Sequence, residues 1–358
     1  MHAKYMKRAL QLAKKGMGKV SPNPLVGAVV VKKDLILAEG YHAFFGGPHA
    51  EAAALQKLDA SQAENSTLYV NLEPCVHQGK TPPCADKIIE YGISKVVMGM
   101  EDPNPLVKGK GIEKFRSAGI EVEVGIMEKQ CRELNEAFVK SITQQSPFVT
   151  LKIAQTLDGK IARETGESKW ITSERARKTV HAMRKAADCI LVGVNTVIQD
   201  NCRLTVRRVK GKGGKRIILD SKLRIPLNVN VLTDDNVSNT VIVTTKKAPE
   251  NKIESIKKTG ASVWIVDENN KGTVSIESLL NQMYENGIIS VLVEGGKKVF
   301  TSFLKQNKVD KIVIFIAPRV FGPGIESFGR LGNSLSPNSF TRIQWQKRGE
   351  EMIFKGWL

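Results

Sequence analysis

Two short segments constrain this chain more than any other feature, because their side chains must meet at one point. GGPHAEAAAL contains His49 and Glu51, and LEPCVHQGKTPPC contains Cys75 and Cys84. One imidazole nitrogen and two thiolates leave tetrahedral zinc a fourth position for water, which is typical of a catalytic site. Zinc lowers the pKa of such a water to about 7. We therefore predict a hydrolytic zinc site with these three ligands, in which Glu51 carries protons without binding the metal.

The order of these residues resembles the His-x-Glu and Pro-Cys-x-x-Cys signature of zinc nucleobase deaminases. Here eight residues separate the cysteines instead of two, and Gly79 with the pair Pro82 and Pro83 allows such a loop to close. Two other imidazoles, those of His42 and His77, are alternative ligands. Their positions favour an exposed or substrate-facing ring over metal binding.

The length of 358 residues exceeds one ordinary core and predicts two domains, with a boundary at the QQSP segment near Gln145. The net charge of +18 is unevenly divided. Residues 1–145 hold 19 basic against 16 acidic residues, whereas residues 146–358 hold 35 against 20. A basic field of this size suits phosphorylated small molecules or nucleic acid. Because the basic runs lack interleaved aromatic residues, we predict no nucleic-acid partner.

The cysteine content and the N-terminal segment indicate the compartment. The five cysteines form no disulfide framework, and MHAKYMKRAL lacks the apolar stretch of a secretory signal. Continuous apolar segments of 18 residues are also missing from the sequence. These features predict a cytoplasmic protein without a membrane span.

The first 145 residues alternate between helix and strand patterns, which predicts a layered α/β sheet. We expect helices over residues 5–15, 48–58, 84–91 and 111–118, and strands over residues 25–31, 67–72, 95–99 and 121–125. The zinc ligands then lie at strand ends and helix starts, where such folds place their sites. In SPNPLVGAVV, the Asn23 amide is able to contact a pyrimidine edge, although an asparagine between prolines is also a common turn residue.

A second α/β unit begins with the strand pattern of PFVTLKIAQT. Its clearest cofactor signal is the segment ISVLVEGGKKVFTSFL, in which an apolar strand ends at Glu294, two glycines follow, and a helix begins. Free amides in the first turn of such a helix hold a pyrophosphate. The full G-x-G-x-x-G pattern is missing, so this segment alone is weak support for a dinucleotide.

Segments along nearly the whole chain resemble one known family, the bifunctional riboflavin-biosynthesis deaminase/reductases. PNPLVGAVVV, GGPHAEAAAL, LEPCVHQGKTPPC and DPNPLVKGKGI resemble its deaminase half, and the eight-residue cysteine spacing is that family's form. LDGKIA, GESKWITS, NTVIQDNCRLTVR and LVEGGKKVFTSFL resemble its reductase half. The resemblance implies a cytidine-deaminase-like three-layer α/β domain over residues 1–145. A dihydrofolate-reductase-like α/β domain would follow over residues 146–358.

The resemblance also implies the chemistry. A diaminopyrimidinone that carries a phosphoribosylamino group would be deaminated with one zinc ion per chain, giving the corresponding uracil. NADPH would then reduce the ribosyl group to a ribityl chain. Members of this family would pair as homo-oligomers through the reductase domain.

By the same resemblance, two sets of residues would line the reductase site. The expected NADPH contacts are Ala154, Trp170, Thr196, Asp200, Ser221, Gly296, Lys297, Lys298, Val299, Phe300, Thr301 and Ser302. The expected substrate contacts there are Ser168, Arg184, Leu204, Arg207 and Glu294. In the deaminase half, the expected substrate contact is the Asn23 amide described above. The two arginines suit a phosphate because a guanidinium binds it bidentately.

Two other functions remain open at this stage. A nucleic-acid deaminase would have the same zinc site and would use the basic second half to guide the strand. A metabolic reductase with a purely structural zinc module is the other alternative.

Overall fold

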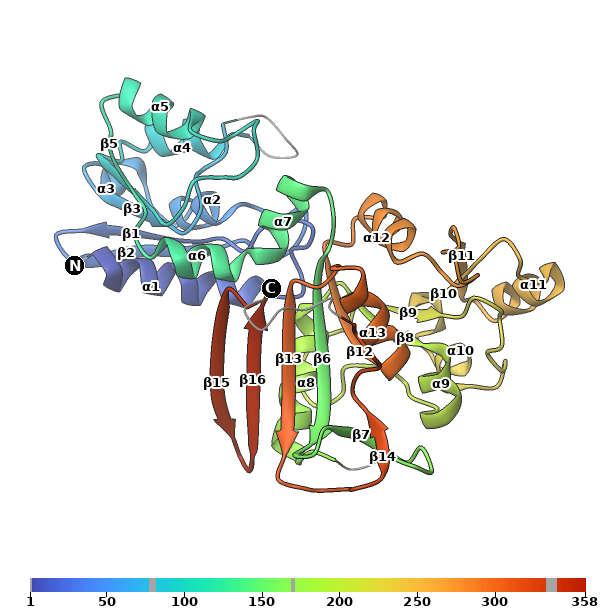
Figure 1. The fold of residues 1–358 in the computed structure, drawn as a ribbon. Helices are drawn as coiled ribbons and strands as arrows, with labels where there is room; N and C mark the ends of the chain where they lie inside the picture. Colours follow the sequence, from blue (N-terminus) through green and yellow to red (C-terminus); the bar gives the residue numbers. More distant parts are fainter. Residues whose placement is uncertain (1, 77–81, 169–170, 333–339) are drawn as a thin grey trace. The chain divides into compact units, whose positions relative to one another are not determined.

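The structure is a computed structural model that describes residues 2–76, 82–168, 171–332 and 340–358. The chain divides into two compact units, Met1–Gln145 and Ser146–Leu358, each with its own sheet (Figure 1). In the described ranges, every helix is too short or too polar to cross a bilayer.

The first unit is built on a five-stranded sheet with the strand order β2-β1-β3-β4-β5. Strand β1 pairs antiparallel with β2 and β3, while β3, β4 and β5 run parallel. The strands are β1 Gly27–Lys32, β2 Leu35–Tyr41, β3 Thr67–Val70, β4 Lys95–Met98 and β5 Glu121–Val124.

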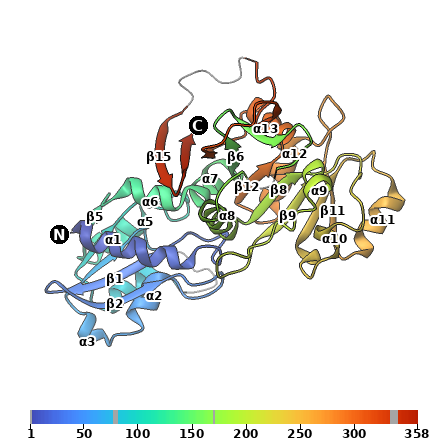
Figure 2. The same cartoon turned by 90° about the horizontal axis from the view of Figure 1, so that it is seen from below.

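Helices cover both faces of this sheet and give the unit three layers. Helices α1 and α6 lie on one side of the sheet, and α2, α4 and α5 lie on the other (Figure 1). In Figure 2 the same unit is seen from below, with α1 lying across β1 and β2. The helices are α1 His2–Ala13, η1 Lys14–Gly16, α2 Ala50–Leu55, α3 Ala60–Ala63, α4 Cys84–Glu90, α5 Lys110–Ser117, α6 Glu128–Leu134 and α7 Glu136–Gln144.

Two glycines allow helices to lie directly against the strand backbone. A Cβ atom on Gly27 would stand 2.1 Å from the carbonyl oxygen of Ala9 in α1. One on Gly40 would stand 2.2 Å from the carbonyl oxygen of Ala50 in α2. Larger residues at either position would therefore push the helix away from the sheet.

A buried carboxylate ties together the loops at the carboxyl ends of β3 and β4. Glu73, which is 3% exposed, accepts the backbone amides of Asp102 at 3.2 Å, Gly109 at 3.1 Å and Gly111 at 2.9 Å. The segment between Glu73 and Cys75 is thereby held against the start of α5.

The second unit has a nine-stranded sheet with the order β11-β10-β9-β8-β12-β6-β13-β16-β15. The pairs from β11 to β13 are parallel, and β16 and β15 add an antiparallel edge. The strands are β6 Phe148–Thr156, β8 Cys189–Gly193, β9 Lys215–Leu219, β10 Thr240–Thr244, β11 Ser262–Ile265, β12 Ser290–Gly295, β13 Lys311–Ala317, β15 Arg342–Arg348 and β16 Glu351–Trp357. A small separate sheet pairs β7 Lys160–Arg163 with β14 Gly324–Glu326.

The central parallel strands of the large sheet are buried on both faces, as expected for such strands. Along β8, Cys189 and Leu191 join a core with α12 and α13, whereas Ile190 and Val192 join one with α9, α10 and α11. Ser173 caps the helix that follows it, accepting the amide of Ala176 at 3.3 Å. The helices are α8 Glu174–Ala186, α9 Val194–Asp200, α10 Asn230–Thr233, η2 Val237–Asn239, α11 Glu250–Lys258, α12 Ile276–Glu285 and α13 Lys297–Lys305.

Because the first unit contains a complete sheet and its own core, we expect a fragment of residues 1–145 to fold alone. It should show α/β circular dichroism and one cooperative thermal transition. An expanded fragment that binds the dye ANS and melts without cooperativity would contradict this expectation.

Candidate active sites

Three side chains of the first unit converge as a metal site. The Nδ1 atom of His49 lies 3.4 Å from the Cys75 sulfur and 3.3 Å from the Cys84 sulfur. All three ligand atoms lie within 4.8 Å of one another. Zinc bond lengths and tetrahedral angles place a nitrogen and a sulfur ligand about 3.6 Å apart. The three side chains therefore fit a zinc ion without rearrangement of the backbone.

Local structure brings each of these ligands into position. His49 is the N-cap of α2, and Cys84 is the first residue of α4. Cys75 follows the clamped Glu73, and its carbonyl accepts the amide of Ala85 at 3.1 Å. The Cys84 amide also points at the Cys75 sulfur, at 3.4 Å. Hydrogen bonds from Cys84 and His49 lower the pKa of the Cys75 thiol, which favours the thiolate form that binds metal.

Glu51 lies in the first turn of α2 and is 3% exposed. Among the described residues, its Oε2 atom has no hydrogen-bond partner. Burial raises the pKa of this carboxyl to about 7, with the nearby Cys75 sulfur as a smaller cause. A buried carboxyl beside the ligand cluster, with its Oε2 atom left without a hydrogen bond, is suited to take up and release a proton.

Asn23 lies beside the imidazole of His42, which the sequence left as an alternative ligand. The His42 Nδ1 atom is 2.9 Å from the Pro48 carbonyl oxygen, which assigns a proton to it. The Nε2 atom then accepts from the Asn23 amide at 3.1 Å. Both ring nitrogens of His42 are thus engaged, and the convergent set is the one containing His49. His77, the other alternative ligand, lies outside the described residues.

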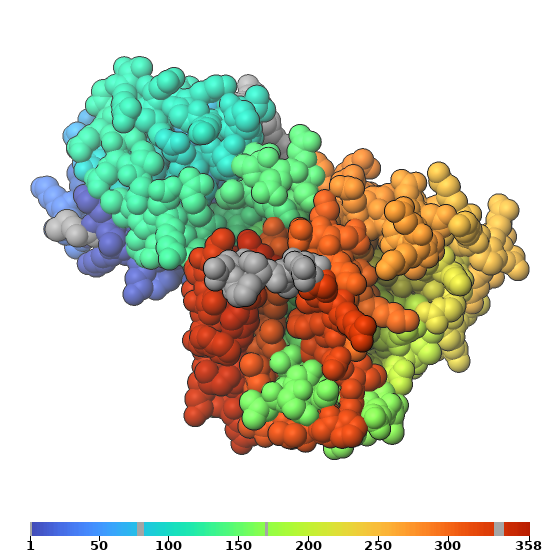
Figure 3. Space-filling model, viewed as in Figure 1, coloured from blue at the N-terminus to red at the C-terminus, as the bar shows by residue number. Residues whose placement is uncertain are grey.

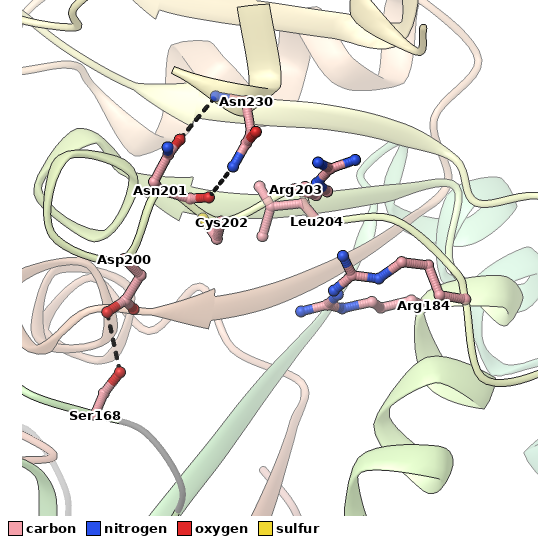
Figure 4. A pocket seen from close by; sticks show the side chains of 9 residues that line it. Ser168, Arg184, Asp200, Asn201, Cys202, Arg203, Leu204 and Asn230 are labelled. Carbon is pink, nitrogen blue, oxygen red and sulfur yellow. Dashed lines mark hydrogen bonds between the residues drawn. The ribbon is translucent and has the colours of Figure 1, made fainter. Parts of the chain in front are cut away.

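A cavity of about 340 Å³ opens in the second unit (Figure 4). It brings together five residues that were predicted from separate parts of the sequence. Its lining consists of Ser168, Arg184, Asp200, Asn201, Cys202, Arg203, Leu204, Arg207 and Asn230. The Ser168 hydroxyl donates to Asp200 at 3.0 Å, linking a predicted substrate residue to a predicted cofactor residue.

Glu294, another predicted substrate residue, holds Arg184 in place. Its carboxylate accepts the Arg184 Nε at 2.5 Å and a terminal nitrogen at 3.0 Å. Lys152 on β6 approaches the same carboxylate at 3.8 Å. Burial alone would raise the pKa of Glu294, but Arg184 and Lys152 outweigh it and the pKa is lowered. Glu294 is therefore a carboxylate at neutral pH.

His181 on α8 helps to fix the other arginine. Its Nδ1 atom accepts the backbone amide of Arg207 at 3.0 Å. Burial, together with the charges of Arg184 and Arg207, lowers the pKa of His181 to about 4, so the ring is neutral. Burial and neighbouring arginines, including Arg203, also lower the pKa of Arg207. Clustered guanidinium groups of this kind favour a bound anion.

The predicted cofactor run forms the N-terminal part of α13. Gly296 is its N-cap, and its carbonyl accepts the amides of Val299 and Phe300. The helix does not use its first-turn amides at Lys297 and Lys298. The Phe300 ring is buried in the core, so this residue can offer a ligand its backbone only.

The other predicted cofactor residues are spread more widely. A Cβ atom on Gly296 would lie 3.4 Å from the Thr196 hydroxyl, which places Thr196 at the glycine turn. Ala154 lies on β6 and packs beside the cluster that includes Ala176 of α8. The Ser221 hydroxyl is occupied by the amide of Val274, at 3.0 Å. Trp170 lies outside the described residues, and the hydroxyls of Thr301 and Ser302 bond to carbonyls within α13.

Sequence reasoning missed several groups at this site. Lys152, a lysine within the apolar pattern of a buried strand, was a visible signal that was not used. Arg203 belongs to the same basic run as Arg207 and could have been noted with it. Asn201 and Asn230 carried no comparable signal, because only the fold brings them together.

Known proteins resemble the chain in both units. Residues 147–354 match the model of the RibD C-terminal domain, and residues 1–100 match the cytidine and deoxycytidylate deaminase zinc-binding region. The riboflavin biosynthesis protein RibD of Aquifex aeolicus is 52% identical over 92% of this chain and 90% of its own. That of Synechocystis is 39% identical over 99% of this chain and 95% of its own.

Solved structures agree. The crystal structure of a diaminohydroxyphosphoribosylaminopyrimidine deaminase/5-amino-6-(5-phosphoribosylamino)uracil reductase from Thermotoga maritima has a TM-score of 0.87 and 41% identity. It covers 99% of this chain and 98% of its own. Acinetobacter baumannii RibD has a TM-score of 0.86 and 33% identity, with the same coverage.

The predicted fold class is confirmed: a cytidine-deaminase-like α/β unit precedes a reductase unit of the RibD type. The chain belongs to the RibD family of bifunctional deaminase/reductases of riboflavin biosynthesis.

Proposed function

We propose that residues 1–145 deaminate the diaminopyrimidinone ribosyl phosphate and that residues 146–358 reduce the resulting uracil with NADPH. The observation that carries the first assignment is the unpartnered Oε2 atom of Glu51 beside three convergent ligand atoms. The second rests on the cavity that gathers Arg184 and Arg207, of which Arg184 is bonded to Glu294 on β12. One zinc ion per chain would be held by His49, Cys75 and Cys84.

In the deamination, Glu51 moves the protons. Zinc, when bound, lowers the pKa of a water molecule to about 7 and so supplies the nucleophile. Glu51 would accept a proton from the attacking water at Oε2 and deliver it to the ring nitrogen, and would then carry the second proton of that water to the departing amine, which leaves as ammonia. The amide of Asn23, held by His42, would meet a polar edge of the pyrimidine.

In the reduction, the chain positions two ligands rather than supplying a reactive group. NADPH supplies the hydride. Arg184 and Arg207 would bind the sugar phosphate, and Glu294 would accept from ribose hydroxyls while keeping Arg184 aligned. The first-turn amides of α13 would hold the cofactor pyrophosphate. Correct juxtaposition of the nicotinamide and the sugar carbon then accounts for the rate.

We also propose that two copies pair through the second unit. Strand β15 forms the edge of the large sheet. Its residues belong to the red, C-terminal part of the chain in Figure 3. On it, Ile343 and Trp345 are 51% and 58% exposed, and they share one face with Met352 of β16, which is 39% exposed. Exposed apolar groups clustered in this way are typical of an interface.

The five free thiols support a reducing, cytoplasmic location for the enzyme.

Removing both thiolates should remove the metal. We expect purified wild-type protein to contain about one zinc per chain and the Cys75→Ala/Cys84→Ala variant to contain almost none, by metal analysis.

Glu51→Gln should keep the zinc but release ammonia about 10²- to 10⁴-fold more slowly, because an amide cannot cycle a proton. Exposed Glu64→Gln is the matched control. Near-normal ammonia release by Glu51→Gln would remove Glu51 from the mechanism.

Substitution of Arg207 should affect the binding of substrate much more than the binding of NADPH. Arg207→Ala should weaken substrate binding by about 2–4 kcal/mol, because it removes a charge-assisted contact, while the Kd of NADPH changes little. Lys246→Ala, which removes a charge at an 83% exposed side chain, should change neither. Steady-state and binding titrations measure both quantities. Equal weakening of both ligands by Arg207→Ala would indicate a general field effect instead.

A charge on the apolar face of β15 should separate the copies. We expect wild-type protein to sediment as a dimer or larger oligomer and Trp345→Glu to sediment as a monomer, because an unpaired carboxylate is costly in a buried interface. Gln346→Glu places the same charge on the opposite face of the strand and should leave the mass unchanged. A monomeric wild-type protein would overturn the proposal.

A further inference from the structure

A buried guanidinium lies behind the cavity of the second unit. Arg216 on β9 is 2% exposed. Its terminal nitrogens donate to the two oxygens of Asp234 at 2.8 and 2.9 Å, and its Nε donates to Thr240 at 3.0 Å. Further bonds go to the carbonyl oxygens of Val231 at 3.1 Å and Arg203 at 3.0 Å. All three nitrogens of the guanidinium are therefore engaged.

Stability alone is a weak reason for such an ion pair. Replacing a buried ion pair with well-packed apolar residues is often neutral or stabilising, because both charges lose their hydration. A guanidinium differs from an apolar side chain in that it fixes backbone carbonyls at defined points. Of the carbonyls that Arg216 holds, that of Arg203 belongs to a residue lining the cavity.

The segment that carries this carbonyl has an unfavourable backbone conformation. Asn201 and Leu204 both have positive φ angles, of 40° and 52°. Asparagine tolerates the left-handed region, but leucine seldom adopts it. Such a conformation persists only where neighbouring groups enforce it. Residues 201–204 must therefore be held from outside.

The second attachment of this segment is Asn230, at the start of α10. Its backbone amide donates to the Asn201 side chain at 2.7 Å, and its side-chain amide donates to the Asn201 carbonyl at 2.6 Å (Figure 4). Arg216 holds the segment near one end, and Asn230 holds it at the other. Arg203 and Leu204, at the end that Arg216 holds, line the cavity together with Arg184.

We propose that Arg216 is a positioning residue of the reductase site, which acts through the Arg203 carbonyl and together with Asn230 to hold residues 201–204. In this arrangement the Arg203 side chain adds a third guanidinium to those of Arg184 and Arg207 for the substrate phosphate. The inference rests on the proposed function of the cavity. The like-charge effect of Arg203 on Arg207 agrees with a shared anion site.

The test measures KM, kcat and NADPH affinity in the full-length protein. Arg216→Lys keeps the buried charge but loses the planar set of bonds, and Asn230→Ala releases the other end of the segment. We expect each to raise the KM for 5-amino-6-(5-phosphoribosylamino)uracil about tenfold, with kcat, the Kd of NADPH and ammonia release within twofold of wild type. Asn236→Ala, an exposed asparagine in the same region, is the matched control and should be unchanged.

A double-mutant cycle tests the route through Arg203. Arg203→Ala should raise KM to a similar extent, and adding Arg216→Lys to it should have a much smaller effect than in the wild-type background. Where Arg216→Lys fails to fold, Asn230→Ala provides the same cycle. Unchanged KM in folded variants, additive effects, or parallel losses of kcat and NADPH affinity would overturn the inference.

The outcome is distinguishable from failure of the proposed function. When Arg207→Ala raises KM and the variants of Arg216 and Asn230 do not, only the positioning role is wrong. When Arg207→Ala leaves KM unchanged, the cavity is not the phosphate site and both proposals fall.

Discussion

The parallel pairing of strands brings their carboxyl ends to one edge of a sheet, and both candidate sites depend on this. In the first unit, the segments after β3 and β4 are joined there by Glu73, and Cys75 follows two residues later. In the second unit, β8 leads into the helix with Thr196, and β12 ends at the glycine turn before α13. Such edges present loops and helix N-termini that a rigid sheet aligns.

Buried charge is the second constraint, and the two units use it differently. In the first unit, the carboxylate of Glu73 is stabilised by three backbone amides. In the second unit, Glu294 and Asp234 each face a buried arginine. Breaking such pairs is costly because one charge is left alone. The arginines are thereby fixed, and a fixed guanidinium discriminates phosphate position better than a mobile lysine.

Most helices and strands of the first unit and its metal site could be predicted from the sequence. Hydrophobic periodicity and the spacing of the ligand residues are both local properties of the chain. The exceptions have tertiary causes. The strand expected from residue 25 begins at Gly27, because the amide and carbonyl of Leu25 bond to the side chains of Asn71 and Asn135. In the second unit, Asp200 and Ser168 could be named only through the family resemblance. The bonds to Asn201 join residues 29 positions apart, which no local pattern reveals.

The missing side chain of Gly40 has a consequence for how the deaminase can change. Helix α2 rests on this glycine and carries Glu51 in its first turn, directly after His49. A single methyl group at position 40 would displace the helix and shift His49 and Glu51 together relative to Cys75, which follows β3, and Cys84, which begins α4. The separation between the Glu51 carboxyl and the two sulfur atoms thus depends on how closely β2 lets α2 approach. A substitution at position 40 would therefore change the geometry of the zinc site although every residue of that site stayed the same.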